Sequence, residues 1–317
     1  MQMRRIAVWM TVLTMLVGAV SHGQTNSKTV YSFLRSDVGA RAAAMAGSFM
    51  TIPGDPTNLF YNAAGLATLV TPRGEAGFFK QLLDINSGYV AYAQPLEEIG
   101  HVGAGVLYTN YGSFTETDEA GNQLGSFSAG DLAVTVAYAN TIGENLTYGA
   151  GVKFIYSSIA GYSSSGIAAD AGILYLIPES RVALGASIRN VGAQIDSYVE
   201  SREPLPLDLT VGASVIPKGL PLLLELNFHR LTDPVDSFGD RFSAFSLGGE
   251  FTISRIVMLR IGYDNTRRKD LKVGDSAGLA GFSAGLGFRY EQFNLDYALS
   301  SLGSVGALHR ISLGSTF

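Results

Sequence analysis

Along most of this chain, apolar residues alternate with small or polar ones at a period of two, and this pattern limits the possible folds more than any other. From Leu132 to Tyr138 the even positions are large and apolar, whereas the odd positions are small or polar. The same alternation runs from Phe282 to Tyr290. Successive side chains of a strand point to opposite faces, so each of these segments has one apolar and one polar face. This pattern is typical of a strand with lipid on one side and a polar lumen on the other.

About fourteen such segments can be counted, and an even number is what a single-chain bacterial outer-membrane barrel requires. We therefore predict an all-β fold: a transmembrane antiparallel β-barrel of about 14 strands. The segments lie at roughly 75–83, 86–94, 101–111, 128–139, 146–157, 166–177, 181–190, 206–216, 220–230, 242–254, 255–264, 279–290, 292–300 and 307–317.

The connections between these segments indicate the same architecture. Short turns follow the even-numbered segments, at 95–100, 140–145, 178–180, 217–219, 254–255 and 291. Most of the other connections are longer, at 112–127, 158–165, 191–205, 231–241 and 265–278. Outer-membrane barrels place short turns in the periplasm and longer loops outside, which a soluble β-sandwich has no reason to do.

Composition also favours a membrane barrel over the alternative, a soluble sandwich or propeller. Only 15% of the residues are charged, against about 25% in typical globular proteins. The chain nevertheless has 47% hydrophobic residues, 38 glycines, 15 tyrosines and 17 phenylalanines. The formal net charge is -5 and no basic stripe is present, so nucleic acid is not an expected partner. With no cysteine, the chain has neither disulfides nor cysteine metal sites.

The first 23 residues have the pattern of a secretory signal. Arg4 and Arg5 form a charged start, residues 6–20 are apolar, and small residues precede Gln24. A membrane anchor is the alternative, but fifteen apolar residues are fewer than the roughly 20 that a spanning helix needs. We predict a signal peptide over 1–23, an N-terminal leader and hatch over 24–72, and an outer-membrane barrel over 73–317. The expected location is the outer membrane of a Gram-negative bacterium, with outer-membrane lipid as a partner.

The stretch from Ser36 to Leu69 differs from everything after it. Asp37 is expected to cap a short alanine-rich helix that ends at Gly47. Asp55 and Pro56 are expected to begin a second short helical piece. The segment is apolar and too short to have a core of its own, so something else must bury it.

This stretch, ARAAAMAGSF followed by GDPTNLFYNAAGLA, resembles the N-terminal signature of the PorV/PorQ family of outer-membrane barrels, which share their fold with the FadL fatty acid transporters. Ala63 stands where the family pattern has proline. The matching residues are Arg41, Met45, Gly47, Asp55, Pro56, Tyr61, Asn62, Ala64, Gly65 and Leu66. The resemblance implies that the segment is a hatch inside the lumen. It also implies a role around type IX secretion, with secretion-machinery proteins and secreted cargo as partners.

Charged residues on the polar faces of the last five strands are expected to form a network in the lumen. These residues are Glu250, Arg260, Arg289, Asp296 and Arg310. A scaffold of ion pairs is favoured over a polar pathway, because facing strands bring opposite charges close together. Arg41 of the hatch is expected to join the network, since a buried arginine needs a carboxylate partner. The terminal Phe317 resembles the C-terminal insertion signal of outer-membrane barrels.

No catalytic or metal-binding constellation is found in the sequence. His101 begins a segment after a short turn and His229 ends one before a long loop, which places them at opposite membrane faces. We therefore predict no enzyme activity and no cofactor. Three functions stay open: a secretion-associated docking barrel, a FadL-like transporter of hydrophobic small molecules, and a structural barrel without transport. The inward positions are mostly small, polar or charged, and we expect this to disfavour a continuous apolar conduit.

Overall fold

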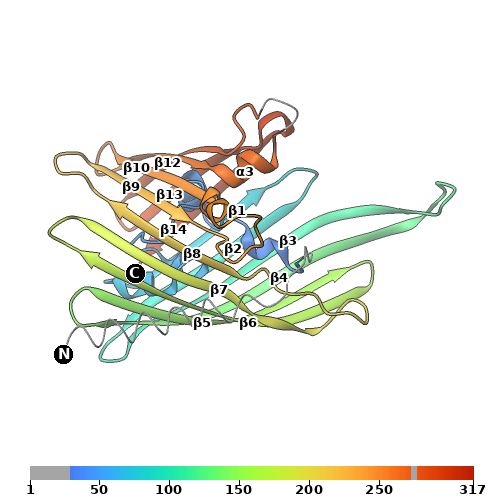
Figure 1. The fold of residues 1–317 in the computed structure, drawn as a ribbon, viewed down its shortest axis with the longest axis horizontal. Coiled ribbons are helices and arrows are strands. Elements are labelled where there is room, and N and C mark those ends of the chain that lie inside the picture. The colour runs from blue at the N-terminus through green and yellow to red at the C-terminus, as the bar shows by residue number, and fades with distance from the viewer. Residues whose placement is uncertain (1–28, 273–276) are drawn as a thin grey trace.

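The computed structural model describes residues 29–272 and 277–317, and the predicted signal segment 1–23 lies outside this part. The described residues form a closed barrel of fourteen antiparallel strands, in which every strand pairs with its sequence neighbours and β1 (Arg73–Lys80) pairs with β14 (Ala307–Thr316) (Figure 1). The predicted fold class and strand number are confirmed. Between the first and last strands lie β2 (Asn86–Leu96), β3 (Gly100–Thr117), β4 (Gln123–Ile142), β5 (Leu146–Ile159), β6 (Tyr162–Ile177), β7 (Val182–Asp196), β8 (Asp208–Val215), β9 (Leu222–Phe228), β10 (Phe245–Thr252), β11 (Val257–Asp264), β12 (Phe282–Tyr290) and β13 (Phe293–Ser301).

The alternation in the sequence becomes an outer apolar face and an inner packed face. On β5, Val152, Phe154 and Tyr156 are exposed, whereas the interleaved Lys153 and Ile155 are buried. An outward band of large apolar side chains around a barrel is the surface that hydrocarbon covers in an outer membrane. Among the described residues, no helix is both long enough and apolar enough to cross a bilayer.

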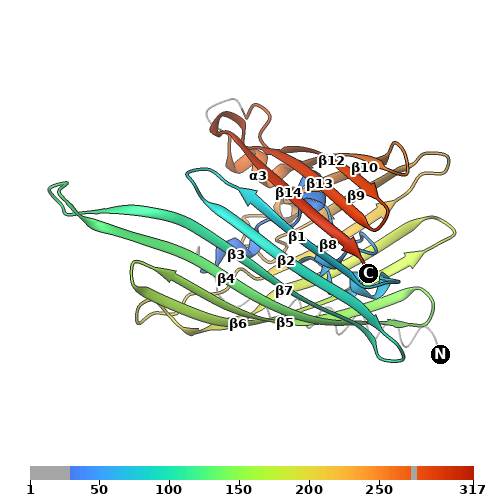
Figure 2. The same cartoon turned by 180° about the vertical axis from the view of Figure 1, so that it is seen from behind.

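Two predicted loops are in fact strand. Most of 112–127 belongs to β3 and β4, whose paired ends project well beyond the rest of the barrel (Figure 2). Within 158–165, only Ala160 and Gly161 lie outside β5 and β6. Outside the bilayer the strands meet water on both sides, so loss of the apolar face does not end backbone pairing. Loop length inferred from the apolar pattern was therefore wrong here, and the strict alternation of short turns and long loops does not hold.

The core of the protein lies inside the barrel, where the N-terminal segment is packed. This segment, residues 29–72, is called the hatch. It contains short helical turns only, η1 (Ser32–Arg35), α2 (Ala40–Ala44), η2 (Pro56–Phe60) and η3 (Ala63–Thr68). Further short turns outside the barrel wall are η4 (Phe238–Ser243), α3 (Asn265–Asp270) and η5 (Gly303–Val305).

The expected helix ends of the hatch are correct at two places and wrong at a third. Asp55 caps η2 by accepting a hydrogen bond from the Thr57 backbone N–H at 3.0 Å, with Pro56 in the first position. Gly47 closes α2 with φ +75°, and its N–H donates to the Ala42 carbonyl at 2.9 Å. Asp37 does not cap α2, whose N-cap is Gly39. The Asp37 carboxylate instead accepts a hydrogen bond from Arg267 of α3.

Glycines of the wall allow the hatch backbone to approach the strands closely. A Cβ at Gly149 on β5 would lie 2.4 Å from the carbonyl carbon of Ala63, and one at Gly262 on β11 would lie 2.4 Å from that of Met45. Both neighbours are backbone atoms, so they cannot move aside as a flexible side chain does. Glycine is therefore the residue these two positions require.

Two arginine substitutions on one strand test where the bilayer lies. Val134 and Leu124 are both exposed and stand at even positions of β4, ten residues or about 33 Å apart along the strand. Val134→Arg lies near mid-barrel and should lower the free energy of unfolding by about 2–4 kcal/mol, whereas Leu124→Arg on the projecting hairpin should cost about 0–1 kcal/mol. Denaturant titration in lipid vesicles measures both. Equal costs would place the hairpin inside the bilayer.

Candidate functional site

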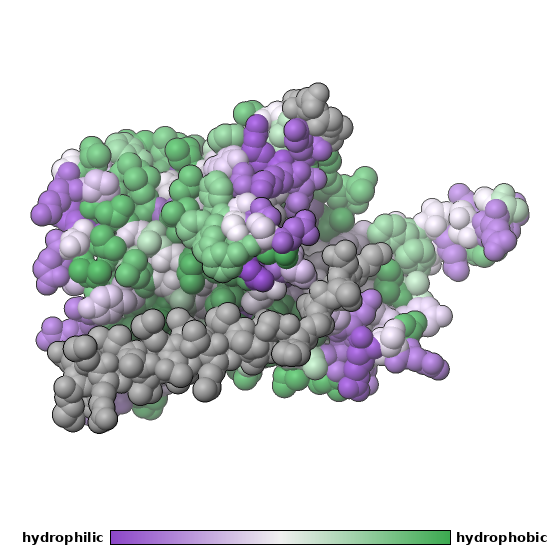
Figure 3. Space-filling view, in the orientation of Figure 1, coloured by the Kyte–Doolittle hydropathy of each residue, from purple (hydrophilic) through white to green (hydrophobic). Residues whose placement is uncertain are grey.

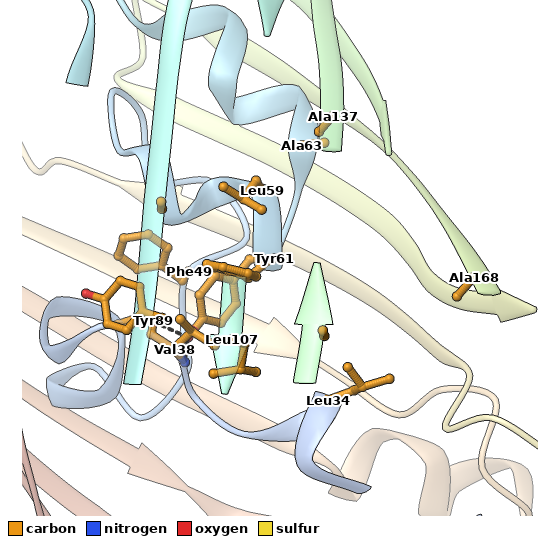
Figure 4. Packing of buried hydrophobic residues seen from close by; sticks show 14 of the residues in the cluster. Leu34, Val38, Phe49, Leu59, Tyr61, Ala63, Tyr89, Leu107, Ala137 and Ala168 are labelled. Carbon is orange, nitrogen blue, oxygen red and sulfur yellow. Dashed lines mark hydrogen bonds between the residues drawn. The ribbon is translucent and has the colours of Figure 1, made fainter. Parts of the chain in front are cut away.

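The hatch has an apolar side that packs on β1–β6. Figure 4 shows hatch side chains such as Phe49, Leu59 and Tyr61 close to Tyr89 of β2 and Leu107 of β3. The ring of Phe60 meets that of Tyr89 edge-on at 6.3 Å between centroids. Buried apolar residues that the wall contributes to this cluster are Phe79, Tyr89, Ala91, Ala93, Leu107, Ala133, Ala137, Ala139, Ile155 and Ala168. This interface is called the apolar seam.

The opposite side of the hatch is held by ion pairs to β10–β13. Arg41 of α2 donates two hydrogen bonds to Glu250 of β10, each 2.8 Å, and one to Asp55 at 3.1 Å. Arg260 of β11 donates to the same Glu250 at 2.6 Å and to Asp296 of β13 at 2.5 Å. The side chain of Arg260 is only 2% exposed. This chain of charges, called the lumen clamp, joins the hatch to three strands.

The structure places the other residues of the expected charge network outside the clamp. Arg289 is exposed near the end of β12 at the periplasmic opening, and no ion pair involves it within the described residues. Arg310 is buried, but it lies over the ring of Phe79 at 5.3 Å and donates to the Ser300 hydroxyl at 3.2 Å, rather than to a carboxylate. The period-two alternation predicted which face of its strand each residue occupies, but it could not predict the residue's partner.

The signature residues of the hatch each have a structural role. Met45 is buried and packs against Gly248 of β10. A Cβ at Gly65 would lie 2.5 Å from the amide nitrogen of Asn58. The amide of Asn62 donates to the carbonyls of Met50 and Ile173, each at 3.0 Å, and thereby joins two parts of the hatch region to β6.

The terminal Phe317 is exposed on the outer face. Its ring lies 6.3 Å from that of Tyr92, and its backbone N–H donates to the Pro72 carbonyl at 2.9 Å. The chain end is therefore fixed beside the start of β1, where the barrel closes.

Sequence reasoning missed a second group of ion pairs at the outer end of the hatch. Asp37 accepts a hydrogen bond from Arg267 of α3 at 2.7 Å. Burial raises the pKa of Asp37, but Arg267, Arg310 and His229 together lower it by more, so the pKa ends below its ordinary value. Arg35 binds both carboxylate oxygens of Asp233, at 3.0 and 2.7 Å. Arg267 and Asp233 lie in loops, where period-two phase gives no direction.

A polar cavity of about 280 Å³ lies between the hatch and the outer ends of β8–β11. Its lining includes Arg35, Arg189 and Arg267, and one N–H of each guanidinium is buried without an acceptor among the described residues. The charges around it are mixed, because Asp37, Asp208 and Asp264 line the same space. Within the described residues no group of three or more His, Asp or Glu side chains could hold a metal ion.

Comparisons with known proteins agree with the barrel architecture. No family model and no curated protein matches the sequence. The chain is similar to the toluene transporter TbuX of Ralstonia pickettii, with a TM-score of 0.62 at 14% identity, covering 88% of this chain and 98% of that one. The toluene transporter TodX of Pseudomonas putida gives 0.60 at 15% identity, covering 91% and 98%. A Pseudomonas aeruginosa FadL homologue gives 0.55 at 10% identity, covering 88% and 98%.

At these identities the likeness concerns the fold alone. The chain has the fold of FadL-type outer-membrane barrels, and the named neighbours are transporters and not enzymes. The resemblance to the PorV/PorQ family stays a prediction from the hatch residues.

The lumen clamp predicts a large effect from one substitution. Glu250→Gln keeps the shape of the side chain but leaves the buried guanidinium group of Arg260 and the mostly buried one of Arg41 without their shared carboxylate. Removal of one partner from a buried ion pair costs about 3–5 kcal/mol, and we expect that loss in the free energy of unfolding. Asp84→Asn is the matched control, because the pair Lys80–Asp84 is 3.8 Å apart and mostly exposed. A loss for Glu250→Gln no larger than for Asp84→Asn would contradict the clamp.

Proposed function

We propose that the chain is a hatch-gated outer-membrane transporter of small hydrophobic molecules. The observation that carries this proposal is the apolar seam, a cluster of buried apolar side chains from the hatch and from the inner face of β1–β6, interrupted by a few hydrogen bonds such as that from Asn62 to the Ile173 carbonyl. The names of the structural neighbours, two toluene transporters and a FadL homologue, support the same class of substrate.

The inward positions of the barrel are mostly small, polar or charged, as expected from the sequence, but β1–β5 also carry large apolar side chains there. Phe79, Tyr89, Leu107 and Ile155 all lie on inward positions of β1–β5. Charged inward residues occur on both halves of the wall, but the carboxylate that pairs with the hatch, Glu250, lies on β10. An apolar solute would find compatible surface at the large apolar side chains of β1–β5.

The two interfaces of the hatch differ in how they resist movement. Ion pairs such as Arg41 with Glu250 are directional and lose most of their energy when the partners separate. Apolar contacts are non-directional, so residues of the seam can slide while a hydrophobic solute replaces the contacts that are lost. We infer that the hatch turns about the lumen clamp and opens along the seam.

A disulfide between hatch and wall tests whether transport needs this movement. The hydroxyls of Ser48 in the hatch and Ser246 on β10 are 2.9 Å apart. Because the chain has no cysteine, Ser48→Cys/Ser246→Cys introduces a single bond that requires the sulfur atoms to approach to about 2.05 Å. Uptake of labelled toluene into vesicles should fall to the level of protein-free vesicles after oxidation, because the bond adds a second fixed point on β10 beside the pair of Arg41 and Glu250 and so prevents the hatch from turning about that pair. Uptake should return after reduction.

The chain offers a matched control that does not touch the hatch. The hydroxyls of Ser283 on β12 and Ser300 on β13 are 3.0 Å apart and both face inward. Oxidised Ser283→Cys/Ser300→Cys should transport like the unmodified protein. Equal uptake by both oxidised variants would remove the gate from the proposal, and no toluene uptake by any form would refute the transport function.

A second candidate is a docking barrel associated with type IX secretion. The observation that favours it is the projecting end of the β3–β4 hairpin, where Phe114 and Phe127 stack at 5.3 Å and Leu124 is 64% exposed. Exposed apolar side chains on a protruding hairpin are suited to contact with another protein. Removal of residues 112–127 should abolish export of secreted cargo and leave toluene uptake unchanged if docking is the function. Export that continues without the hairpin would contradict this candidate.

A further inference from the structure

The outer wall of the barrel carries an apolar groove of about 810 Å³ that crosses β8–β12. Its floor is one register row of backbone, in which each residue pairs with the next: Ser214, Glu225, Gly248, Gly262 and Ser283. The side chains of Ser214, Glu225 and Ser283 point inward and are buried. The groove therefore presents apolar side chains and backbone to its occupant, and its volume lies within the range of about 300–1,000 Å³ found for ligand pockets.

Small outward residues make the depression. Ala213 on β8, Gly249 on β10 and Ala284 on β12 lie among larger neighbours on the strands between them. Those neighbours form two flanking rows, one with Val215, Leu224, Ile261 and Leu299 and the other with Leu226, Leu247, Tyr263 and Phe282. Because the rows run perpendicular to tilted strands, the groove is a long diagonal channel on the membrane face. Its shape suits a single chain of methylene groups.

A continuous row of aromatic rings lies along the outer edge of the groove. Neighbouring ring centroids are 5.0–6.5 Å apart from η4 to β12, in the order Phe238, Phe242, Phe228, Phe245, Tyr263 and Phe282. Aromatic residues gather where hydrocarbon meets the polar headgroups of a bilayer. The row therefore marks the outer-leaflet interface, with the groove beneath it.

The segment that follows β11, at this end of the groove, is rich in basic residues. Residues 265–272 contain four basic residues, Arg267, Arg268, Lys269 and Lys272, and one acidic residue, Asp270. Arg267 is used by Asp37, but Lys269 and Lys272 are exposed. Arg268 donates to the Gly278 carbonyl at 3.0 Å and so ties α3 to the turn that carries Leu279 and Phe282 of the groove. Figure 3 shows this hydrophilic patch beside the apolar surface of the strands.

We propose that the groove and α3 together bind one phosphorylated acyl glycolipid of the outer leaflet, of the lipid A class. An acyl chain lies in the groove across β8–β12, and a phosphate of the headgroup is bound by Arg268, Lys269 and Lys272. The basic residues next to the channel favour an anionic occupant, because neither a second copy of this barrel nor a neutral lipid would pair with them. This site faces the bilayer and is independent of the gate in the lumen.

The binding experiment uses the full barrel, folded into phosphatidylcholine nanodiscs, with lipid A and its dephosphorylated form as probes. Native mass spectrometry counts retained lipid, and titration gives the dissociation constant. Lipid A should bind with a stoichiometry of one, and dephosphorylation should weaken binding by at least about tenfold, since ion pairing at the headgroup is lost.

Two variants test the two halves of the site. Gly249→Leu fills the groove, and its new Cβ would meet only side-chain atoms of Ile261, Leu224 and Leu222 at 3.6–3.9 Å. It should weaken lipid A binding about tenfold by removing apolar burial, whereas Ala150→Leu, on the outward face of β5, should have no effect. Arg268→Gln/Lys269→Gln/Lys272→Gln should weaken lipid A binding to that of the dephosphorylated probe. Arg181→Gln/Lys218→Gln/Arg255→Gln, exposed residues of the short turns, is the charge-matched control.

The change in gel mobility on heating shows that each variant is folded before binding is measured. Equal affinity for the two probes would overturn the headgroup contact. Unchanged lipid A binding by Gly249→Leu would overturn the groove as the acyl site. Appearance of a dimer that Gly249→Leu abolishes, in place of retained lipid, would assign the groove to a second copy of the chain and reject the lipid.

Discussion

The structure depends on charges that are taken out of water and can be stable only together. Arg41, Glu250, Arg260 and Asp296 form one buried chain from the hatch to β13. An ion buried alone is strongly unfavourable, whereas a set with complete hydrogen bonding is tolerated. The hatch therefore has one defined seat in the lumen, because any other position would leave guanidinium or carboxylate groups without partners.

The same arrangement makes the two sides of the hatch mechanically different. The ionic side is specific in direction and partner, while the apolar seam with β1–β6 combines non-directional apolar contacts with a few hydrogen bonds, such as that from Asn62 to the Ile173 carbonyl. Gly149 and Gly262 bring the backbone of the hatch against opposite regions of the wall, so the plug fills the lumen without bulky side chains between. A segment fixed on one side and adaptable on the other is suited to act as a gate.

The strands of the barrel wall differ in length, and its outer surface differs accordingly. Strands β8–β11 have only 7–8 residues, whereas β3 and β4 have 18 and 20. A membrane-spanning strand needs about 9–11 residues. Exposed apolar residues in the adjoining turns, Leu220, Ile253 and Ile256, extend the apolar band of this short wall. The lipid-facing groove lies on this side, where the strands are shortest.

The sequence by itself determined the barrel, because period-two alternation fixes which face of each strand meets lipid. It also placed the cap at Asp55 and the left-handed end at Gly47, since these are local effects of a few neighbouring residues. The pairing of Arg41 with Glu250, and of Asp37 with Arg267, became known only from the tertiary structure. So did the absence of an ion pair at Arg289 within the described residues. Two residues more than 200 positions apart in the sequence pair only if strand register, barrel closure and the position of the hatch bring them together. None of these three is encoded in a local pattern.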